Sequence, residues 1–268
     1  MKDYLKFGII WVILSALGEW AAYFVGNHFY YTTGAVQAVD GQNAAAFVLY
    51  TVVPIFMFVV LMLFFGIFQF KRKGNENASP HQYRTNKTFI GIWVTLSLVI
   101  NLFLFVHPTA SAMQTYFNQA AAYNKKSSNE LIVDVTGRQW EWRFSYPQYG
   151  ITQAVSAKTG NDVLVLPVDR PVKFVIRSYD WNHPYDSQVD VIHSFWIPAF
   201  GFKTDAIPGE TRYEYILPTK IASTATNAMY RVQCAEDCGP GHPYMESNMK
   251  VVSASNFQTW IAQQKKLQ

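Results

Sequence analysis

The segment AAAFVLYTVVPIFMFVVLMLFFGIFQF, Ala44 to Phe70, has 27 residues and no charged side chain. A helix of about 20 apolar residues is long enough to cross the hydrocarbon core of a bilayer. Two similar stretches flank this segment: Phe7 to Gly26 has 20 residues and one charge, Glu19, whereas Thr88 to Val106 has 19 residues and no charge. The sequence therefore predicts three membrane-spanning helices, at 7–26, 44–70 and 88–106, within residues 1–107.

The first apolar stretch has a second interpretation as a signal peptide, because Lys2 and Lys6 give it a basic start. No small-residue cleavage site stands out after Gly26, which favours a retained span. Glu19 inside this stretch is either a structural residue that snorkels or pairs, or a functional acid, and the sequence leaves both readings open.

The charges between the spans predict the orientation in the membrane. The loop from Lys71 to Lys87 contains five Lys and Arg residues and one Glu, whereas residues 27–43 contain only Asp40 as a charge. Basic loops lie on the cytoplasmic side of membranes. We therefore expect a cytoplasmic N-terminus, a cytoplasmic loop at 71–87, and everything after Val106 on the outer face.

The composition changes after a linker at 108–129. Short runs rich in β-branched and aromatic residues, such as ELIVDVTG, QWEWRFSYP, PVKFVIRS and DVIHSFWIP, alternate with turn signals. This pattern predicts an all-β sandwich or barrel over 130–268, with a short helix from Asn256. From Pro108 onward the chain has 15 Lys and Arg against 14 Asp and Glu, a net charge of 15 − 14 = +1.

The segment CAEDCGPGHPYM, 234–245, contains both cysteines of the chain. A disulfide is one reading, although a bridge across so short a loop would stabilise the fold little. The alternative is a metal site, because thiolate, thioether and imidazole groups together favour copper or another soft transition metal. His193 in DVIHSFWIP is the candidate ligand from elsewhere in the fold. Taken alone, a histidine among large apolar residues is more often a buried core imidazole, and the cysteine loop is what favours the ligand role.

These residues resemble a known family. DVIHSFWIPAFGFKTDAIPG together with CAEDCGPGHPYM resembles subunit II of haem-copper cytochrome c oxidases, and GRQWEWRFSYP and RTNKTFIGIWVTLSLV are also similar to that family. The resemblance extends from about Ala44 to the end of the chain. It implies a cupredoxin-like Greek-key sandwich, on the outer face of the membrane, that carries a binuclear copper A centre.

The resemblance also implies roles for individual residues. Two thiolates would bridge two copper ions, one imidazole would bind each ion, and a thioether and a backbone carbonyl would complete the set. The implied ligands are His193, Cys234, Glu236 through its carbonyl, Cys238, His242 and Met245. The Glu236 side chain is expected to bind magnesium at the junction with the large subunit, where Lys203 and Asp205 would also lie. Trp140 is the expected electron entry point.

The implied function is electron entry into a proton-translocating respiratory oxidase. Cytochrome c, or another copper or haem protein, would reduce the copper centre, which would pass electrons to haem in subunit I, where oxygen becomes water. No haem is expected on this chain, because all six histidines lie outside the uncharged span cores. The expected partners are subunit I, the other oxidase subunits and the membrane, without nucleic acid.

Three other functions are compatible with parts of this pattern. A nitric oxide reductase can use the same copper module. A quinol oxidase subunit has this architecture but lacks copper ligands, and a copper-delivery or storage protein would expose its thiols for exchange. The complete ligand set in this sequence favours electron transfer over the last two.

The sequence departs from the family pattern in three places. Ile90 stands where the family usually has an acid that delivers protons, so the proton route is open. Residues 179–188 form a longer connection than usual, in which His183 is expected to be an ordinary loop residue. The extra first span makes a mitochondrial origin unexpected and favours a prokaryotic plasma membrane.

Overall fold

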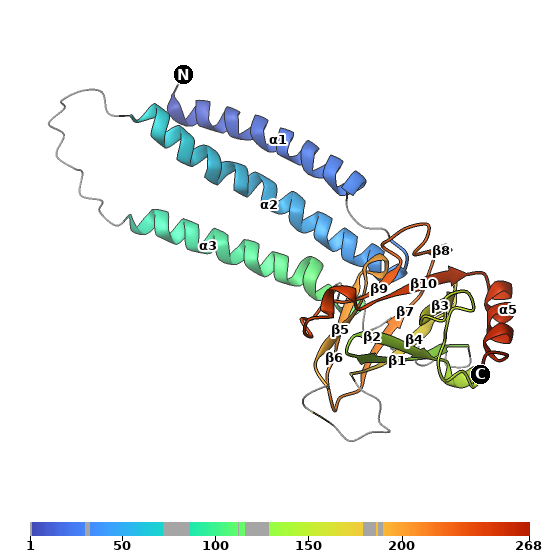
Figure 1. Cartoon of the computed structure of the whole chain (residues 1–268). Coiled ribbons are helices and arrows are strands. Elements are labelled where there is room, and N and C mark those ends of the chain that lie inside the picture. Colours follow the sequence, from blue (N-terminus) through green and yellow to red (C-terminus); the bar gives the residue numbers. More distant parts are fainter. Residues whose placement is uncertain are drawn as a thin grey trace. The chain divides into compact units, whose positions relative to one another are not determined.

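The computed structural model describes residues 2–29, 33–71, 86–111, 113–115, 129–178, 186 and 190–268. The chain divides into two compact units. The helical unit contains Met1–Tyr30 and Asn43–Met113, and the β unit contains Tyr31–Gln42 and Gln114–Gln268. Figure 1 shows long helices in the first unit and strands in the second.

The three predicted apolar segments form helices: α1 is Asp3–Phe29, α2 is Val36–Gln69 and α3 is Lys87–Leu104. Each is long and apolar enough to cross a membrane. Their apolar side chains are mostly exposed, and α3 has no buried residue. Such exposure is costly in water and is expected where lipid or another membrane protein covers the helix. A short π-helical turn, η1 Phe105–Ala110, follows α3.

Helices α1 and α2 pack closely because α1 has a glycine, Gly18, where it faces α2. A Cβ added at Gly18 would lie 2.8 Å from Val53 Cγ1, so only glycine allows this approach. The indole of Trp11 donates a hydrogen bond of 2.9 Å to the carbonyl of Pro54. Small residues and interhelical hydrogen bonds are the usual means of helix packing where apolar burial supplies little driving force.

The β unit contains two mixed sheets. The four-stranded sheet has the order β2-β1-β4-β7, and the larger sheet runs β3-β10-β9-β5-β6, with β8 paired to β10. The pairs β1–β4 and β3–β10 are parallel and the others are antiparallel. The strand bounds are β1 Leu131–Arg138, β2 Glu141–Ser145, β3 Val163–Pro167, β4 Val172–Arg177, β5 His193–Ile197, β6 Phe202–Ala206, β7 Arg212–Ile216, β8 Ala222–Ser223, β9 Arg231–Cys234 and β10 Glu246–Val252.

The two sheets enclose one aromatic core. Burial alternates along β1, so that every second side chain points inward, as expected of a strand with one solvated face. Trp142 on β2 and Phe174 on β4 contact Phe195 of the other sheet, with ring centroids 5.4 and 5.1 Å apart. This packing confirms the predicted β-sandwich.

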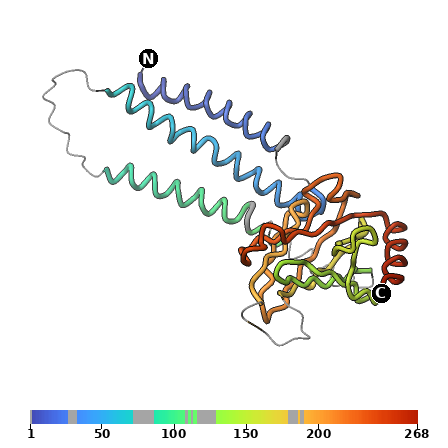
Figure 2. Tube along the Cα trace, in the orientation of Figure 1, coloured from blue at the N-terminus to red at the C-terminus, as the bar shows by residue number. Residues whose placement is uncertain are grey.

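The predicted C-terminal helix is α5, Ala254–Gln264, which lies at one side of the β domain (Figure 2). Ser253 caps its N-terminus by accepting a hydrogen bond from the backbone of Asn256. Phe257 and Ile261 are buried. Gln264 is also buried, because its amide bonds both the N–H and the carbonyl of Val155, at 3.0 and 2.7 Å.

The segment that precedes α2 belongs to the β unit, which the sequence did not predict. Gly34 donates to the carbonyl of Ala199 at 2.7 Å and accepts from Thr219 at 2.9 Å. Ala35 forms a β-bridge with Pro218 and is completely buried in the sandwich core. Residues 33–35 therefore act as an added edge of the β domain, and we call them the docked segment.

Candidate metal centre

The cysteine loop connects β9 to β10 and is closed at its base. Cys234 is the last residue of β9, and its N–H donates to the carbonyl of Met245 at 3.0 Å. Ala235 donates to the carbonyl of Ser194, which ties the loop to β5. Gly239 has a φ of +108°, a backbone conformation that only glycine adopts readily. The loop is thus held at both sides.

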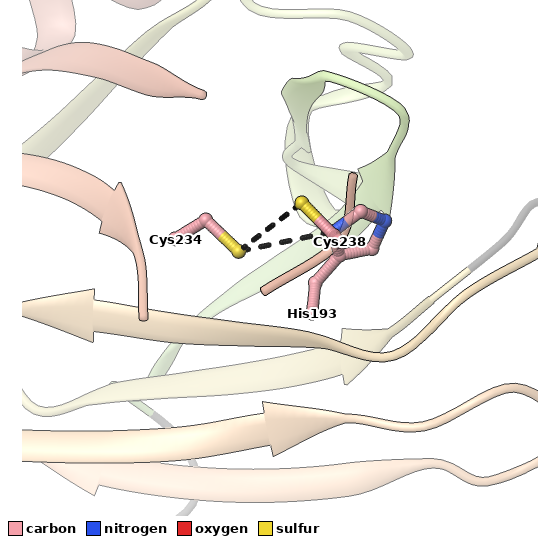
Figure 3. Close-up of side chains that lie close together, drawn as sticks. All are labelled: His193, Cys234 and Cys238. Atoms are coloured by element: carbon pink, nitrogen blue, oxygen red, sulfur yellow. Dashed lines mark hydrogen bonds between the residues drawn. The ribbon is translucent and has the colours of Figure 1, made fainter. Parts of the chain in front are cut away.

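The two thiols lie side by side and are buried (Figure 3). Cys234 Sγ and Cys238 Sγ are 3.9 Å apart, far beyond the ~2.05 Å of a disulfide bond. Cys234 Sγ is 3.8 Å from Nδ1 of His193 on β5, and the thiol donates to the carbonyl of Glu236 at 3.3 Å. These contacts form the first half of the site.

Cys238 forms the second half of the site. Its Sγ lies 3.6 Å from Nδ1 of His242, in the short helix η4 His242–Tyr244, and 3.9 Å from Sδ of Met245. Both imidazoles present the same ring nitrogen to a thiol. The structure therefore brings the six predicted ligand residues to one place, although His193 is 41 positions from Cys234 in the sequence.

Burial disfavours charge on the unbound donors. It lowers the pKa of His193 to about 4, and the nearby His242 adds to this effect. Burial, followed by the charge of Cys234, raises the pKa of Cys238 to about 12. The unbound Cys238 thiol is therefore neutral near pH 7. A bound cation reverses this preference, because it stabilises the thiolates that coordinate it.

The donor set fits a soft metal ion. Metal–sulfur bonds are about 2.3 Å long for zinc, so two sulfurs closer than about 4.6 Å can bind one ion together. The observed separation of 3.9 Å meets this condition. His193, Cys234 and Cys238 also form a cluster whose ligand atoms all lie within 4.8 Å of one another. Two thiols, two imidazoles and a thioether favour copper among the common metals.

Packing fixes the His193 ring in place. Its centroid lies 5.9 Å from that of Trp142, and a Cβ added at Gly137 would lie 3.0 Å from both rings. Its Nε2 is buried without a hydrogen-bond partner within the described chain. Sequence reasoning missed Gly137; the signal was its place immediately before the aromatic run RQWEW.

The two tryptophans occupy different environments because Trp142 lies on β2 whereas Trp140 lies in the turn before it; a two-residue spacing within a strand would place both on the same face. Trp142 is completely buried, whereas Trp140 is 40% exposed. The Trp140 indole donates a 3.0 Å hydrogen bond to the carbonyl of Cys238, which also accepts one of 2.8 Å from the Gln139 amide. A Cβ added at Gly241 would lie 2.2 Å from the Trp140 ring. The Trp140 ring therefore packs against the cysteine loop, residues 234–245. Gln139 donates to the same carbonyl, and the sequence did not single out this residue.

The other predicted residues lie outside this donor cluster. Lys203 and Asp205 are on β6 and line a surface pocket of about 430 Å³; Asp205 accepts a hydrogen bond from Ser194, next to His193. The Glu236 side chain is exposed, and Ile90 lies exposed on α3. His183, the connection at 179–185, loop residues 72–85 and linker residues 116–128 lie outside the described residues.

Together these features define a class: a protein with membrane-type helices and a β-sandwich that carries a soft-metal loop. Residues 131–252 match the model of the family described as cytochrome C oxidase subunit II, periplasmic domain. The β domain of this chain therefore belongs to the cytochrome c oxidase subunit II family, and its sandwich is the cupredoxin-like fold that the sequence predicted.

Individual relatives agree with this assignment. Cytochrome c oxidase subunit 2 of Bacillus sp. (strain PS3) is 29% identical over 191 residues, which cover 71% of this chain and 49% of the relative. A probable cytochrome c oxidase subunit 2 of Rickettsia prowazekii is 30% identical over 230 residues, or 81% and 65% of the two chains. The chain thus spans about half the length of the Bacillus relatives that it matches.

Among solved structures, the chain is similar to the periplasmic domain of subunit II of cytochrome oxidase from Bradyrhizobium japonicum. The two are 28% identical, with a TM-score of 0.42, and the match covers 52% of this chain and 96% of that domain.

Proposed function

We propose that this protein is the electron-entry subunit of a respiratory terminal oxidase. It accepts electrons from cytochrome c, or from another copper or haem protein, and passes them to haem in subunit I, which reduces oxygen to water. One observation carries the proposal: two buried thiols, two imidazoles and a thioether converge within 3.6–3.9 Å in a domain of the subunit II family.

In this proposal Cys234, Cys238, His193 and His242 would hold two copper ions, with Met245 as a weak ligand and the carbonyl of Glu236 completing the set. Bound copper would supply a site for one electron at a time. The chain itself holds the ligands rigidly and keeps water away from them, because the side chains of Cys234, Cys238, His193 and Met245 are all buried. A preorganised, water-excluding site reorganises little when its charge changes.

Trp140 is the proposed entry point for electrons. Its ring reaches the surface, and its hydrogen bond ends on the backbone of a bridging residue, Cys238. One side chain thus links the solvent to the metal loop. The alternative role of Trp140 is packing of the loop alone, and the two roles are separated by experiment in the Discussion.

The exposed Glu236 side chain is the proposed magnesium ligand. A carboxylate suits a hard cation, and magnesium usually takes only one or two carboxylates from a protein chain. The remaining ligands would come from the neighbouring subunit. Lys203 and Asp205 on β6 belong, in this proposal, to the same junction.

The proposed setting is a prokaryotic plasma membrane, with the N-terminus in the cytoplasm and the β domain on the outer face. Oxygen reduction is assigned to the partner subunit. A nitric oxide reductase with the same copper module is the second candidate, and gas consumption by the purified complex distinguishes them: oxygen uptake supports the oxidase, and nitric oxide uptake without oxygen uptake supports the reductase.

The test of the metal centre is spectroscopic. The full-length chain, purified in detergent and loaded with copper, should be coloured and show a seven-line electron paramagnetic resonance pattern, which arises when one unpaired electron is shared by two copper nuclei. A colourless chain that binds zinc and no copper would overturn the proposal.

A further inference from the structure

The carbonyl oxygen of Cys238 accepts two hydrogen bonds, and both donors come from the turn between β1 and β2. Nε2 of the Gln139 amide donates at 2.8 Å, and Nε1 of the Trp140 indole donates at 3.0 Å. A carbonyl oxygen has two lone pairs, so these two donors use its full accepting capacity. The indole is the proposed electron entry, whereas the amide has no role in the function proposed above.

The two hydrogen bonds hold the tip of the cysteine loop, residues 236–241. The base of the loop is fixed by the N–H groups of Cys234 and Ala235, which donate to backbone carbonyls at its two sides. The tip is held largely by itself: His242 donates to the carbonyl of Gly239 at 2.9 Å. In the part of the chain that the structure describes, the hydrogen-bond donors that reach the tip from another element are Gln139 and Trp140.

The carbonyl that receives these bonds belongs to a peptide that is free to rotate. It precedes Gly239, whose φ of +108° and missing Cβ let the Cys238–Gly239 peptide turn at little steric cost. Rotation would swing the carbonyl away from both donors. It would also move the Cys238 side chain, whose Sγ lies 3.6 Å from Nδ1 of His242. A ligand residue next to a glycine therefore needs an external restraint.

Gln139 supplies a restraint that Trp140 does not supply alone. The indole ring is 40% exposed and presents one N–H group to the carbonyl. The Gln139 side chain is less exposed and packs over the same backbone, because a Cβ added at Gly239 would lie 3.4 Å from its Nε2. With the amide in place, the carbonyl cannot turn toward water without breaking both bonds. The amide thus also keeps the acceptor of the indole in position.

We propose that Gln139 is a positioning residue of the metal centre. Its amide fixes the Cys238–Gly239 peptide, and through this peptide it places the Cys238 sulfur and maintains the contact with Trp140. This inference rests on the proposed function. Groups that hydrogen-bond to metal-ligating residues orient the ligands and tune the metal. The N–H dipole of Gln139 also points its positive end at the loop, which stabilises the form of the centre that has gained an electron.

Gln139→Met tests the proposal in the full-length chain, purified in detergent and loaded with copper. Methionine is unbranched and of similar length but has no N–H group to donate. Competition with a chelator should show a loss of copper affinity of about tenfold, the lower end of the usual effect of such partners. The splitting of the seven resonance lines should change, and the midpoint reduction potential should fall because the stabilising dipole is gone.

Gln148→Met is the matched control. Gln148 lies in the short helix η2, Pro147–Tyr149, and its Nε2 also donates to a backbone carbonyl, that of Glu130, at 2.7 Å. Both variants lose an amide donor and are expected to melt at a lower temperature. Only Gln139→Met should change the copper affinity, the resonance splitting and the potential. Equal changes in both variants, or a change in melting temperature alone, would make Gln139 an ordinary structural residue and overturn the proposal.

A double-mutant cycle identifies the shared carbonyl. Trp140→Phe removes the other donor, so the double variant leaves the Cys238 carbonyl with neither. Its copper affinity should fall further than the product of the two single losses, by at least about twofold, because residues that share a partner are energetically coupled. Losses that simply multiply would show that Gln139 acts elsewhere, which would also overturn the proposal. Gln139→Asn, which keeps the amide on a shorter side chain, should lie between Gln139→Met and the unmodified chain.

Two further outcomes separate this inference from the function on which it rests. Unchanged copper affinity, resonance splitting and potential in Gln139→Met would overturn the positioning role and leave the electron-entry proposal standing. An unmodified chain that binds no copper would remove the proposed function and the positioning role together.

Discussion

Cys234 and Cys238 have different neighbours, and this difference predicts what each substitution does. Replacing either thiol with a hydroxyl, in Cys234→Ser or Cys238→Ser, removes a soft ligand that one remaining sulfur cannot replace at both ions. The seven-line resonance pattern should disappear and the copper content should fall. Met245→Leu should be milder, with copper retained and the reduction potential shifted. Full copper content and unchanged spectra in either serine variant would contradict the assignment of the centre.

Trp140 and Trp142 are matched tests of electron entry. Trp140→Phe removes the hydrogen bond to Cys238, a net change of about 0.5–1.5 kcal/mol, and alters the ring at the surface. An entry role predicts intact copper spectra with a large loss of donor-linked turnover. Steady-state oxygen uptake, driven by a reduced cytochrome donor, measures the loss.

The buried partner is the internal control. Trp142→Phe removes volume from the core beside His193 and Phe195 and should lower the free energy of unfolding by about 1–3 kcal/mol, with a smaller effect on transfer. Thermal denaturation followed by near-ultraviolet circular dichroism checks this value. If the order of the two variants were reversed, Trp142 would be the better entry candidate.

At the scale of elements, the docked segment at 33–35 makes a prediction that the sequence alone does not. A Cβ at Gly34 would lie 2.6 Å from the Tyr230 hydroxyl and 3.0 Å from the backbone oxygen of Ala199. Gly34→Ala should therefore displace the segment and destabilise the β domain by about 1–3 kcal/mol. The temperature at which the copper spectrum is lost on heating measures this change.

Gly41 supplies the control for this prediction. It lies within α2, and a Cβ added there would meet nothing within 4 Å. Gly41→Ala should leave the melting temperature of the copper centre unchanged or raise it slightly, because alanine favours helix by about 1 kcal/mol over glycine. Equal melting temperatures for Gly34→Ala and the unmodified chain would show that the docked segment contributes little to stability.

For the whole molecule, the charge pattern predicts that the basic loop and the β domain lie on opposite sides of the membrane. Trypsin should cut the loop between Lys71 and Lys87 only in inside-out vesicles, because its five basic residues hold it on the cytoplasmic side. The β domain should be accessible only in right-side-out vesicles. Cleavage of both regions in the same vesicles would contradict the predicted orientation.

Patterns formed by residues close together in the sequence predict most of the architecture. Uncharged runs such as Ala44 to Phe70 predict membrane-type helices without reference to any neighbour, because their length and lack of charge are sufficient. Alternating β-branched runs predicted the strands for the same reason. The place of Thr33 to Gln42 in the β unit was missed, because Gly34 and Ala35 carry no apolar periodicity and are buried through backbone hydrogen bonds to residues more than 160 positions away.

Neighbours along the chain are enough to predict the three apolar spans, the all-β character of the C-terminal part, and the types of residue in the cysteine loop. The tertiary structure alone decided that Nδ1 of His193 faces Cys234, that Trp140 lies on Gly241, and that Gln139 donates to the same loop. The physical reason is strand register, since pairing between strands brings distant residues together, and a shift of one position would turn strand residues such as His193 to the opposite face of the sheet.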